Sequence, residues 1–444
     1  MVRFTFKVIS FYFFFIFLSF QCYGCTFNCG SSEGSLSVLP QDDPGGPAVK
    51  YGDSYFTIEM PETARPNDAT ISLYEDGRRG YFQQLKIRGN MYSISPKGNA
   101  EPFKITKNLK SETLEAQLSK GYILSYLYYD DGTIKYNGLP KSGRFDRDID
   151  DKTLFFTHST GKSIISYIVG HAICEGYISS VNEPINWPLM DNTLYDGQPL
   201  INLLNMNAGD KHTVNPRSSR VMGSNKHHRD MDHISIAELL HGTKRESNKL
   251  FYNNVLTDII ASYVAYRAGD DYSKFIKNVF QDKIKIENEV HFELHRKTSL
   301  NSQKPLYGKL QTRASYSFLI TRGDLLRVAI SMMKDYQQQT CVGNYLRDLQ
   351  AQAISYKHFS GLGRTNNKNP SLWFHTFARK YGGQFYFDFH KMDGRNIIGT
   401  NGWNNQNILI DLDKSRIVVT QSAATAWDLR TFMFNVIRDG KLPK

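Results

Sequence analysis

The sequence predicts an α+β fold, in which an antiparallel sheet is flanked by helices and carries an inserted, mainly helical lobe. Strand-like runs begin at about residue 71, helical periodicity dominates residues 159–345, and short strand-like runs return after about residue 380. Strands, then a helical stretch, then strands and a final helix are typical of one α+β domain with an insert. We therefore expect a single folded domain over residues 71–444.

The first 24 residues have the pattern of an export signal. Arg3 and Lys7 precede an apolar run over residues 8–18, which is too short for a comfortable membrane span. An uncleaved N-terminal membrane anchor is the alternative, because no small-x-small cleavage site stands out. Residues 25–70, rich in Gly, Ser, Pro and Asp, are then a low-order linker. These features predict an exported protein that is periplasmic, or membrane-anchored and facing the exterior of the cytoplasm.

The composition is that of a globular protein, because 40% of the 444 residues are hydrophobic and 13% are aromatic. The formal net charge of +11 would suit an anionic partner. However, the basic residues are scattered, with no Lys/Arg block and no zinc-finger spacing, which disfavours nucleic-acid binding. Nothing in the sequence indicates an oligomeric state.

Five cysteines form an odd set from which no disulfide framework can be assigned. Cys22, Cys25 and Cys29 follow the export pattern directly, where lipid attachment, a small local disulfide or free thiols are alternatives. Cys174 falls in a predicted helix and is interpreted as a core residue. Cys341 has no evident partner.

The elements of the folded part follow from periodicity and turn residues. The strand-like segments are a hairpin over 121–136 with an Asp-Gly turn at 130–132, the apolar run 154–156, and short strands at 384–389, 407–411 and 417–420. The helical segments are 114–120, a helix from 159 that stops at Gly176, a helix starting near Val255, and helices over 272–282, 322–336 and 426–438.

The segment most suited to chemistry is the start of the helix that follows the run 154–156. Ser159 and Lys162 lie three residues apart there, on one helical face. A lysine amine in that position can withdraw the proton of the serine, and a helix N-terminus favours the developing negative charge. One alternative is a plain N-cap serine beside a solvated lysine. A phosphate-binding loop is the other, but it requires glycine at position 156, which is Phe.

Two later segments offer the further groups that such a nucleophile needs. Tyr252 and Asn254 lie two residues apart at a predicted helix entrance, where a phenol beside an ammonium could act as a general base. The alternative is an interfacial aromatic residue and an N-cap. Near the chain end, Thr400, Gly402 and Trp403 precede a strand, and the glycine would permit close backbone approach to a ligand. A simple hairpin turn is the alternative there.

The order Ser159-x-x-Lys162, Tyr252-x-Asn254 and a glycine-containing strand at 400–402 resembles the serine β-lactamase and penicillin-binding-protein superfamily. The resemblance is strongest to its class C β-lactamase-related branch, which includes esterases and D-amino-acid peptidases. Segments 171–178, 200–210 and 321–327 also resemble the usual text of this family. The resemblance covers about residues 110–435 and implies a β-lactamase/transpeptidase-like fold.

The resemblance implies a serine hydrolase that forms an acyl-enzyme on Ser159 from an ester, amide or lactam, and hence a small acyl or peptide-like substrate. It implies that Lys162 and Tyr252 activate the serine, that Tyr252 passes the proton to the leaving group, and that Asn254 orients the substrate or Lys162. Backbone N–H groups of Ser159 and the 402–403 strand edge would hold the oxyanion. No cofactor and no metal are implied.

One departure narrows this expectation. The third motif of the family usually begins with Lys or His, whereas this sequence has Thr400. The replacement disfavours recognition of a lactam carboxylate, and so disfavours a true β-lactamase, but leaves a backbone role for Gly402 and Trp403. It also motivates an alternative function, a catalytically weak or inactive envelope protein that keeps the fold as a binding module.

A second group of polar residues, His212 and the segment 227–233, contains four histidines and two aspartates. Its spacing does not match a helical zinc motif. We interpret it as a polar loop that borders the site and shapes substrate choice, with a metal site as the alternative.

Overall fold

The structure is a computed structural model. It describes residues 70–75, 78–84, 91–106, 109–142, 145, 149–211, 213–215, 220–221, 231–246, 248–294, 314–315, 318–355, 377–423 and 427–444. The predicted export signal over 1–24, and the predicted linker except its last residue, lie outside this part of the chain. Within the described residues, no helix combines the length and the apolar character needed to cross a membrane.

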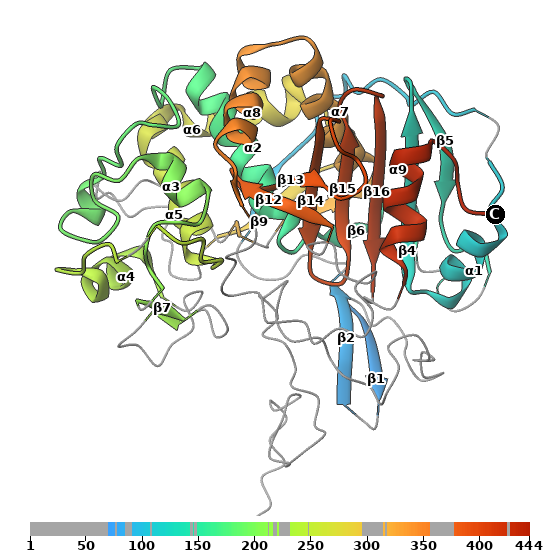
Figure 1. Cartoon of the computed structure of the whole chain (residues 1–444), viewed down its shortest axis with the longest axis horizontal. Coiled ribbons are helices and arrows are strands. Elements are labelled where there is room, and N and C mark those ends of the chain that lie inside the picture. The colour runs from blue at the N-terminus through green and yellow to red at the C-terminus, as the bar shows by residue number, and fades with distance from the viewer. Residues whose placement is uncertain are drawn as a thin grey trace, which may run out of the picture.

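An eight-stranded antiparallel sheet forms the centre of the molecule (Figure 1). Its strand order is β11-β12-β13-β14-β15-β16-β4-β5, so two early strands complete a sheet made mostly of late ones. The strands are β4 (Ile123–Asp130), β5 (Thr133–Gly138), β11 (Ile354–Ser355), β12 (Ala378–Gly382), β13 (Phe385–Phe389), β14 (Ile397–Gly402), β15 (Gln406–Asp411) and β16 (Arg416–Ser422). Strands β14 and β15 are buried along their whole length, which means that both faces of the sheet are covered there.

The predicted Asp-Gly hairpin is confirmed as the connection between β4 and β5. Asp131 and Gly132 both have positive φ, 44° and 81°, as a two-residue hairpin turn of the primed type requires. On its other side β4 pairs with β16, where Val418 lies opposite Tyr128.

A smaller sheet contains the strand that precedes Ser159. Its order is β3 (Met91–Ile94), β9 (Val290–Glu293), β10 (Phe318–Thr321) and β6 (Leu154–Phe156). The apolar run 154–156 is therefore a short strand, as the sequence predicts. Two further hairpins are β1 (Thr70–Glu75) with β2 (Arg78–Gln84) and β7 (Val214–Asn215) with β8 (Arg220–Val221).

The segment between β6 and β11 is mainly helical and confirms the predicted inserted lobe; its helices α3, α4, α5 and α6 lie to one side of the sheet in Figure 1. Helices of the described chain are α1 (Glu112–Lys120), α2 (Thr160–Cys174), α3 (Leu200–Leu204), α4 (His233–Leu240), α5 (Val255–Ala268), α6 (Tyr272–Lys277), α7 (Arg322–Gln337), α8 (Cys341–Ala351) and α9 (Asn435–Asp439). Short 3₁₀ turns occupy Pro188–Met190 and Gly269–Asp271, and π-helical turns occupy Asn278–Lys283 and Arg430–Phe434. The α+β fold class is thus confirmed.

The structure corrects the interpretation of two cysteines. Cys174, at the end of α2, forms a disulfide with Cys341, the first residue of α8, with 5.8 Å between their Cα atoms. The expectation that Cys341 has no partner was wrong. Helix α8 was not predicted, and the two residues, 167 positions apart, meet only because α8 packs against α2.

Candidate active site

Helix α2 begins at a sharp turn. Strand β6 ends at Phe156, and His158 then adopts a positive φ of 48°, a backbone region that non-glycine residues rarely occupy. The His158 imidazole is held edge-on between the rings of Phe156 (4.7 Å between centroids) and Trp403 (5.3 Å). This packing fixes the turn that delivers Ser159 to the helix start.

Ser159 occupies the N-cap position of α2, but its side chain makes no capping hydrogen bond. Instead, its Oγ lies 2.8 Å from the Nζ of Lys162, one turn further along the helix. The alternative in which Ser159 is only a cap is therefore wrong. The two residues that the sequence pairs are in contact.

Lys162 is buried, and its Nζ lies within hydrogen-bond distance of three oxygen atoms. These are Ser159 Oγ at 2.8 Å, Asn254 Oδ1 at 2.6 Å and the backbone carbonyl oxygen of Ser315 at 2.8 Å. Hydrogen bonds of this kind offset the cost of removing an amine from water. The lysine is thus not the solvated side chain of the cap alternative.

Tyr252 is buried beside the same nitrogen. Its ring centroid lies 5.0 Å from Lys162 Nζ, and its ring also meets the ring of Tyr381 edge-on at 6.1 Å. One contact between Tyr252 and Lys162 is therefore through the aromatic ring. The interfacial-aromatic alternative describes this packing, and a role of the phenol in proton transfer stays a prediction.

The segment that carries Tyr252 and Asn254 ends where α5 begins. Asn254 stands at the N-cap position of α5 without a side-chain capping bond, so the N-cap alternative for its side chain is wrong. Its neighbour Asn253 takes the capping role, because Asn253 Oδ1 accepts a hydrogen bond from Leu256 N at 3.1 Å. Because Asn253 caps α5, the amide oxygen of Asn254 can instead accept a hydrogen bond from Lys162.

Asp258 and Ser315, which were not expected from the sequence, help to hold Lys162 in place. Asp258, buried one turn after Asn254, accepts a hydrogen bond from Ser315 N at 2.9 Å, and Ser315 in turn offers its carbonyl oxygen to Lys162. The sequence signals Asp258 only through its i, i+4 spacing from Asn254. It does not signal Ser315, because a backbone carbonyl can come from any residue type.

Thr400 lies in β14 opposite the first turn of α2. Its Oγ1 is 3.1 Å from Thr160 Oγ1 and accepts a hydrogen bond from Ile408 N, also at 3.1 Å. Thr160 Oγ1 donates to the carbonyl oxygen of Gln406 at 2.5 Å. The position where the family usually has a cation is thus part of a neutral, buried hydrogen-bond chain.

Gly402 permits a close approach, but to the protein itself. A Cβ atom built on Gly402 would lie 2.2 Å from the backbone oxygen of Thr157, so only glycine fits beside the turn that precedes Ser159. The space that a side chain would take at Gly402 is therefore filled by the protein, and a close approach of its backbone to a ligand stays a prediction. The hairpin-turn alternative is wrong for Thr400 and Gly402, because both residues belong to strand β14. Trp403 begins the turn that follows.

The predicted His/Asp loop falls largely outside the described residues, namely His212 and positions 222–230. Its last residue, His233, is buried as the first residue of α4, with its ring 6.2 Å from that of Trp187. Within the described ranges, no group of three or more His, Cys, Asp or Glu side chains could hold a metal ion.

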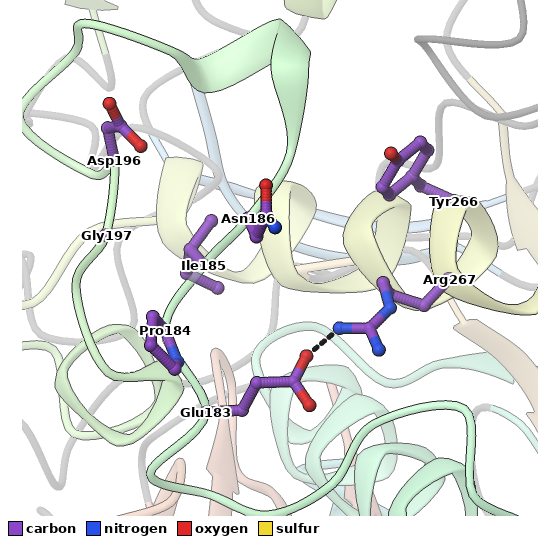
Figure 2. A pocket seen from close by; sticks show the side chains of 8 residues that line it. All are labelled: Glu183, Pro184, Ile185, Asn186, Asp196, Gly197, Tyr266 and Arg267. Carbon is purple, nitrogen blue, oxygen red and sulfur yellow. Dashed lines mark ion pairs between the residues drawn. The ribbon is translucent and has the colours of Figure 1, made fainter.

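A separate cavity of about 790 Å³ lies at the other end of α5 (Figure 2). An ion pair between Glu183 and Arg267 lies on one side, and Asp196 and Gly197 come from the facing loop. Helix α5 has 14 residues and thus spans about 20 Å, with Asn254 before its first residue and Arg267 in its last turn. This cavity is therefore distinct from the site around Ser159.

The sequence matches no protein-family model, and no curated protein matches it. Among solved structures, a proposed 6-aminohexanoate-dimer hydrolase of Bacillus anthracis superposes with a TM-score of 0.54 and 11% identity, over 80% of this chain and 92% of that one. A penicillin-binding-protein homologue of Pyrococcus abyssi, described as octameric, gives 0.49 and 16%, over 74% and 76%. A D-stereospecific amidohydrolase of Streptomyces sp. gives 0.49 and 13%, over 75% and 100%. At these identities the similarity concerns the fold.

Proposed function

We propose that this chain, which has the fold of the serine β-lactamase and penicillin-binding-protein superfamily, is a serine hydrolase that forms an acyl-enzyme on Ser159. One observation carries the proposal: Lys162 Nζ is buried between Ser159 Oγ and two carbonyl-type oxygens, those of Asn254 and Ser315. Carbonyl oxygens only accept hydrogen bonds. A neutral lysine amine would give its two N–H groups to them and direct its lone pair at the serine hydroxyl, which is the geometry of a general base.

In the proposed reaction, Ser159 Oγ attacks the carbonyl carbon of an ester or amide substrate, and its proton passes to Lys162. Backbone N–H groups of Ser159 and Trp403 stabilise the oxyanion of the tetrahedral intermediate. As the bond to the leaving group breaks, Tyr252 delivers a proton to that group, with Lys162 as the source. Water then hydrolyses the ester on Ser159, with the same residues acting in reverse.

The neutral surroundings of Thr400 restrict the proposed substrate. Its hydroxyl is committed to Thr160 and to Ile408 N, and it offers no positive charge. We therefore propose small acyl or peptide-like esters and amides that lack a carboxylate next to the scissile bond. Lactam antibiotics, which carry such a carboxylate, are expected to be poor substrates.

Export from the cytoplasm belongs to the same proposal. Disulfides persist in oxidising compartments, and the Cys174–Cys341 bond joins two helices of the folded domain. The export pattern over residues 1–24 points the same way. Whether that segment is cleaved or stays as a membrane anchor is decided by the N-terminal sequence of the mature protein.

The test is covalent labelling of the folded protein. The wild type is incubated with a fluorophosphonate and with short p-nitrophenyl esters, and the adduct is located by intact mass and peptide mapping. We expect one adduct on Ser159 that is absent from Ser159→Ala. Ser163→Ala is the matched control, because Ser163 lies in the same helix but donates to the Gln384 carbonyl oxygen instead. The proposal is refuted if labelling persists in Ser159→Ala. It is also refuted if no probe labels the folded wild type.

Thr400 also motivates the second candidate, a binding module without turnover. In that case Ser159→Ala would retain ligand affinity and cellular phenotype, and no ester would be turned over by the wild type. Measuring turnover and affinity in the same two proteins separates the candidates.

A further inference from the structure

Asp210 is a buried carboxyl group that the proposed reaction does not use. It lies beyond α3 and is 0% exposed. Its Oδ2 accepts hydrogen bonds from the Tyr195 hydroxyl at 2.9 Å and from Asn253 Nδ2 at 3.0 Å. Its Oδ1 is also buried and has no hydrogen-bond partner within the described chain. An orphaned buried carboxylate oxygen costs stability, so its retention calls for an explanation.

The explanation lies in what Asn253 does. This residue stands between Tyr252 and Asn254, the two residues that contact Lys162. One end of its amide caps α5 through Leu256 N, and the other end is anchored on Asp210. Through this hydrogen bond, Asp210 holds the segment 252–254 in position.

The backbones on both sides strengthen this connection. Phe251 N donates to the carbonyl oxygen of Met206 at 2.6 Å, and Glu246 N donates to that of Gly209 at 3.1 Å. The segments 206–210 and 246–254 are thus joined at three places, two through the backbone and one through Asp210. A change at Asp210 reaches Asn253 directly, without passing through solvent-exposed groups.

We propose that Asp210 is a positioning residue for Tyr252 and Asn254, and that its protonation state sets how firmly these two residues are held against Lys162. The inference rests on the proposed hydrolase function. An ionised carboxylate accepts hydrogen bonds that are about twice as strong as those of a neutral acid. Protonation at the unpartnered Oδ1 would leave both bonds to Oδ2 in place and weaken them. The site would then loosen as the pH falls.

The surroundings of Asp210 make this protonation accessible near neutral pH. Burial raises the pKa of Asp210 to about 6, against the lowering effect of the hydrogen bonds from Tyr195 and Asn253, and the charge of Glu246 raises it further. Burial and the Asp210 charge keep the pKa of Tyr195 well above its usual value, so Tyr195 stays a donor. The other charged groups within or next to these segments are Lys211, Lys244, Arg245 and Lys249, and none of them forms an ion pair with Asp210 within the described chain.

The experiment measures the rate at which a fluorophosphonate labels Ser159 between pH 4.5 and 8.5, in the full chain and in Asp210→Asn. We expect the wild-type rate to fall on the acid side with an inflection near pH 6. Asp210→Asn, a permanent analogue of the protonated acid, should lack that inflection and label about tenfold more slowly at pH 8. An unchanged acid inflection in Asp210→Asn overturns the proposal.

Tyr195→Phe is the second variant, and it covers the case in which Asp210→Asn fails to fold. It removes one hydrogen bond to the carboxylate, which should move the inflection to higher pH. An unmoved inflection in a folded Tyr195→Phe also overturns the proposal. A third measurement does not depend on catalysis: the melting temperature of the wild type relative to Asp210→Asn should fall as the pH rises from 4 to 7. If no probe labels Ser159 at any pH, the proposed function fails, while this stability comparison still reports whether Asp210 titrates as inferred.

Discussion

Asn254 Oδ1 lies 2.6 Å from Lys162 Nζ, closer than the Ser159 hydroxyl oxygen, which lies 2.8 Å from the same nitrogen. One buried nitrogen thus joins the first turn of α2 to the start of α5. Because the amide oxygen of Asn254 accepts one hydrogen bond from that nitrogen, it restricts the directions of the other bonds of the nitrogen. This makes Asn254 a natural place to begin testing the site.

Asn254→Ala is expected to lower the free energy of unfolding by about 1–3 kcal/mol, because it removes an acceptor from a buried amine. It should also slow labelling of Ser159 by about 10- to 100-fold, since Lys162 is no longer oriented. Urea unfolding and labelling kinetics measure the two effects. Asn182→Ala, at an exposed asparagine, is the control and should change stability by less than about 0.5 kcal/mol. Wild-type labelling kinetics in Asn254→Ala would contradict the orienting role.

Gly402→Ala should damage both stability and activity. The new methyl group would lie 2.2 Å from the Thr157 backbone oxygen, so β14 must move away from the turn before Ser159. We expect a loss of about 1–3 kcal/mol, measured by urea unfolding, and slower acylation. Gly323→Ala provides the comparison, because there the nearest atom is 3.6 Å away and the position is helical. That variant should be neutral or more stable by up to about 1 kcal/mol. If both substitutions have the same effect, the steric explanation is wrong.

Removal of the disulfide should change stability far more than chemistry. Cys174→Ala/Cys341→Ala is expected to lower the free energy of unfolding by about 2–4 kcal/mol, through greater freedom of the unfolded chain. Ser159 lies at the opposite end of α2, whose 15 residues span about 20 Å, so its labelling rate should stay within about twofold. Dithiothreitol should reproduce the loss in the wild type and have no further effect on the double variant. If dithiothreitol does not lower the free energy of unfolding of the wild type, the disulfide assignment is wrong.

His171 should make the domain sensitive to mild acid. Burial lowers the pKa of His171 to about 4, and Lys283 adds to this while Asp335 opposes it. Because the pKa is about 6.5 in the unfolded chain, protons bind that state preferentially, and stability falls as the pH drops from about 6.5 to 4. Between pH 7 and pH 5, a shift of the His171 pKa from 6.5 to about 4 corresponds to a loss of about 2 kcal/mol in the free energy of unfolding. His171→Phe should lose that component in urea unfolding at the two pH values, and an undiminished pH effect would refute the assignment.

The sequence predicts the parts of the fold that local patterns determine. The β4–β5 hairpin follows from alternating apolar residues and an Asp-Gly turn, and helix α7 follows from its apolar periodicity. Strand β14 was expected as a glycine-bearing edge or a turn, because Gly399, Asn401 and Gly402 are poor strand residues. It forms because β13 and β15 pair with it from both sides, which local propensity does not contain.

For the site, the spacing of Ser159 and Lys162 was sufficient to predict their contact, because residues three apart lie on the same face of a helix. The contact from Lys162 to Asn254 required the family resemblance, since α2 and α5 meet only through packing. The roles of Ser315 and Asp210 could not be predicted. One acts through a backbone carbonyl, and the other through a neighbour of the motif rather than the motif itself.

The pairing of β4 with β16 has a consequence for how the protein is made. Ser159, Lys162, Tyr252 and Asn254 all precede β16 in the chain, so a nascent chain carries these four residues while β4 still lacks its neighbour. Contacts between distant segments form slowly, and an unpaired strand edge invites association with other chains. The sheet therefore closes only after β16 has been made, and a chain that is truncated before β16 leaves one edge of β4 unpaired.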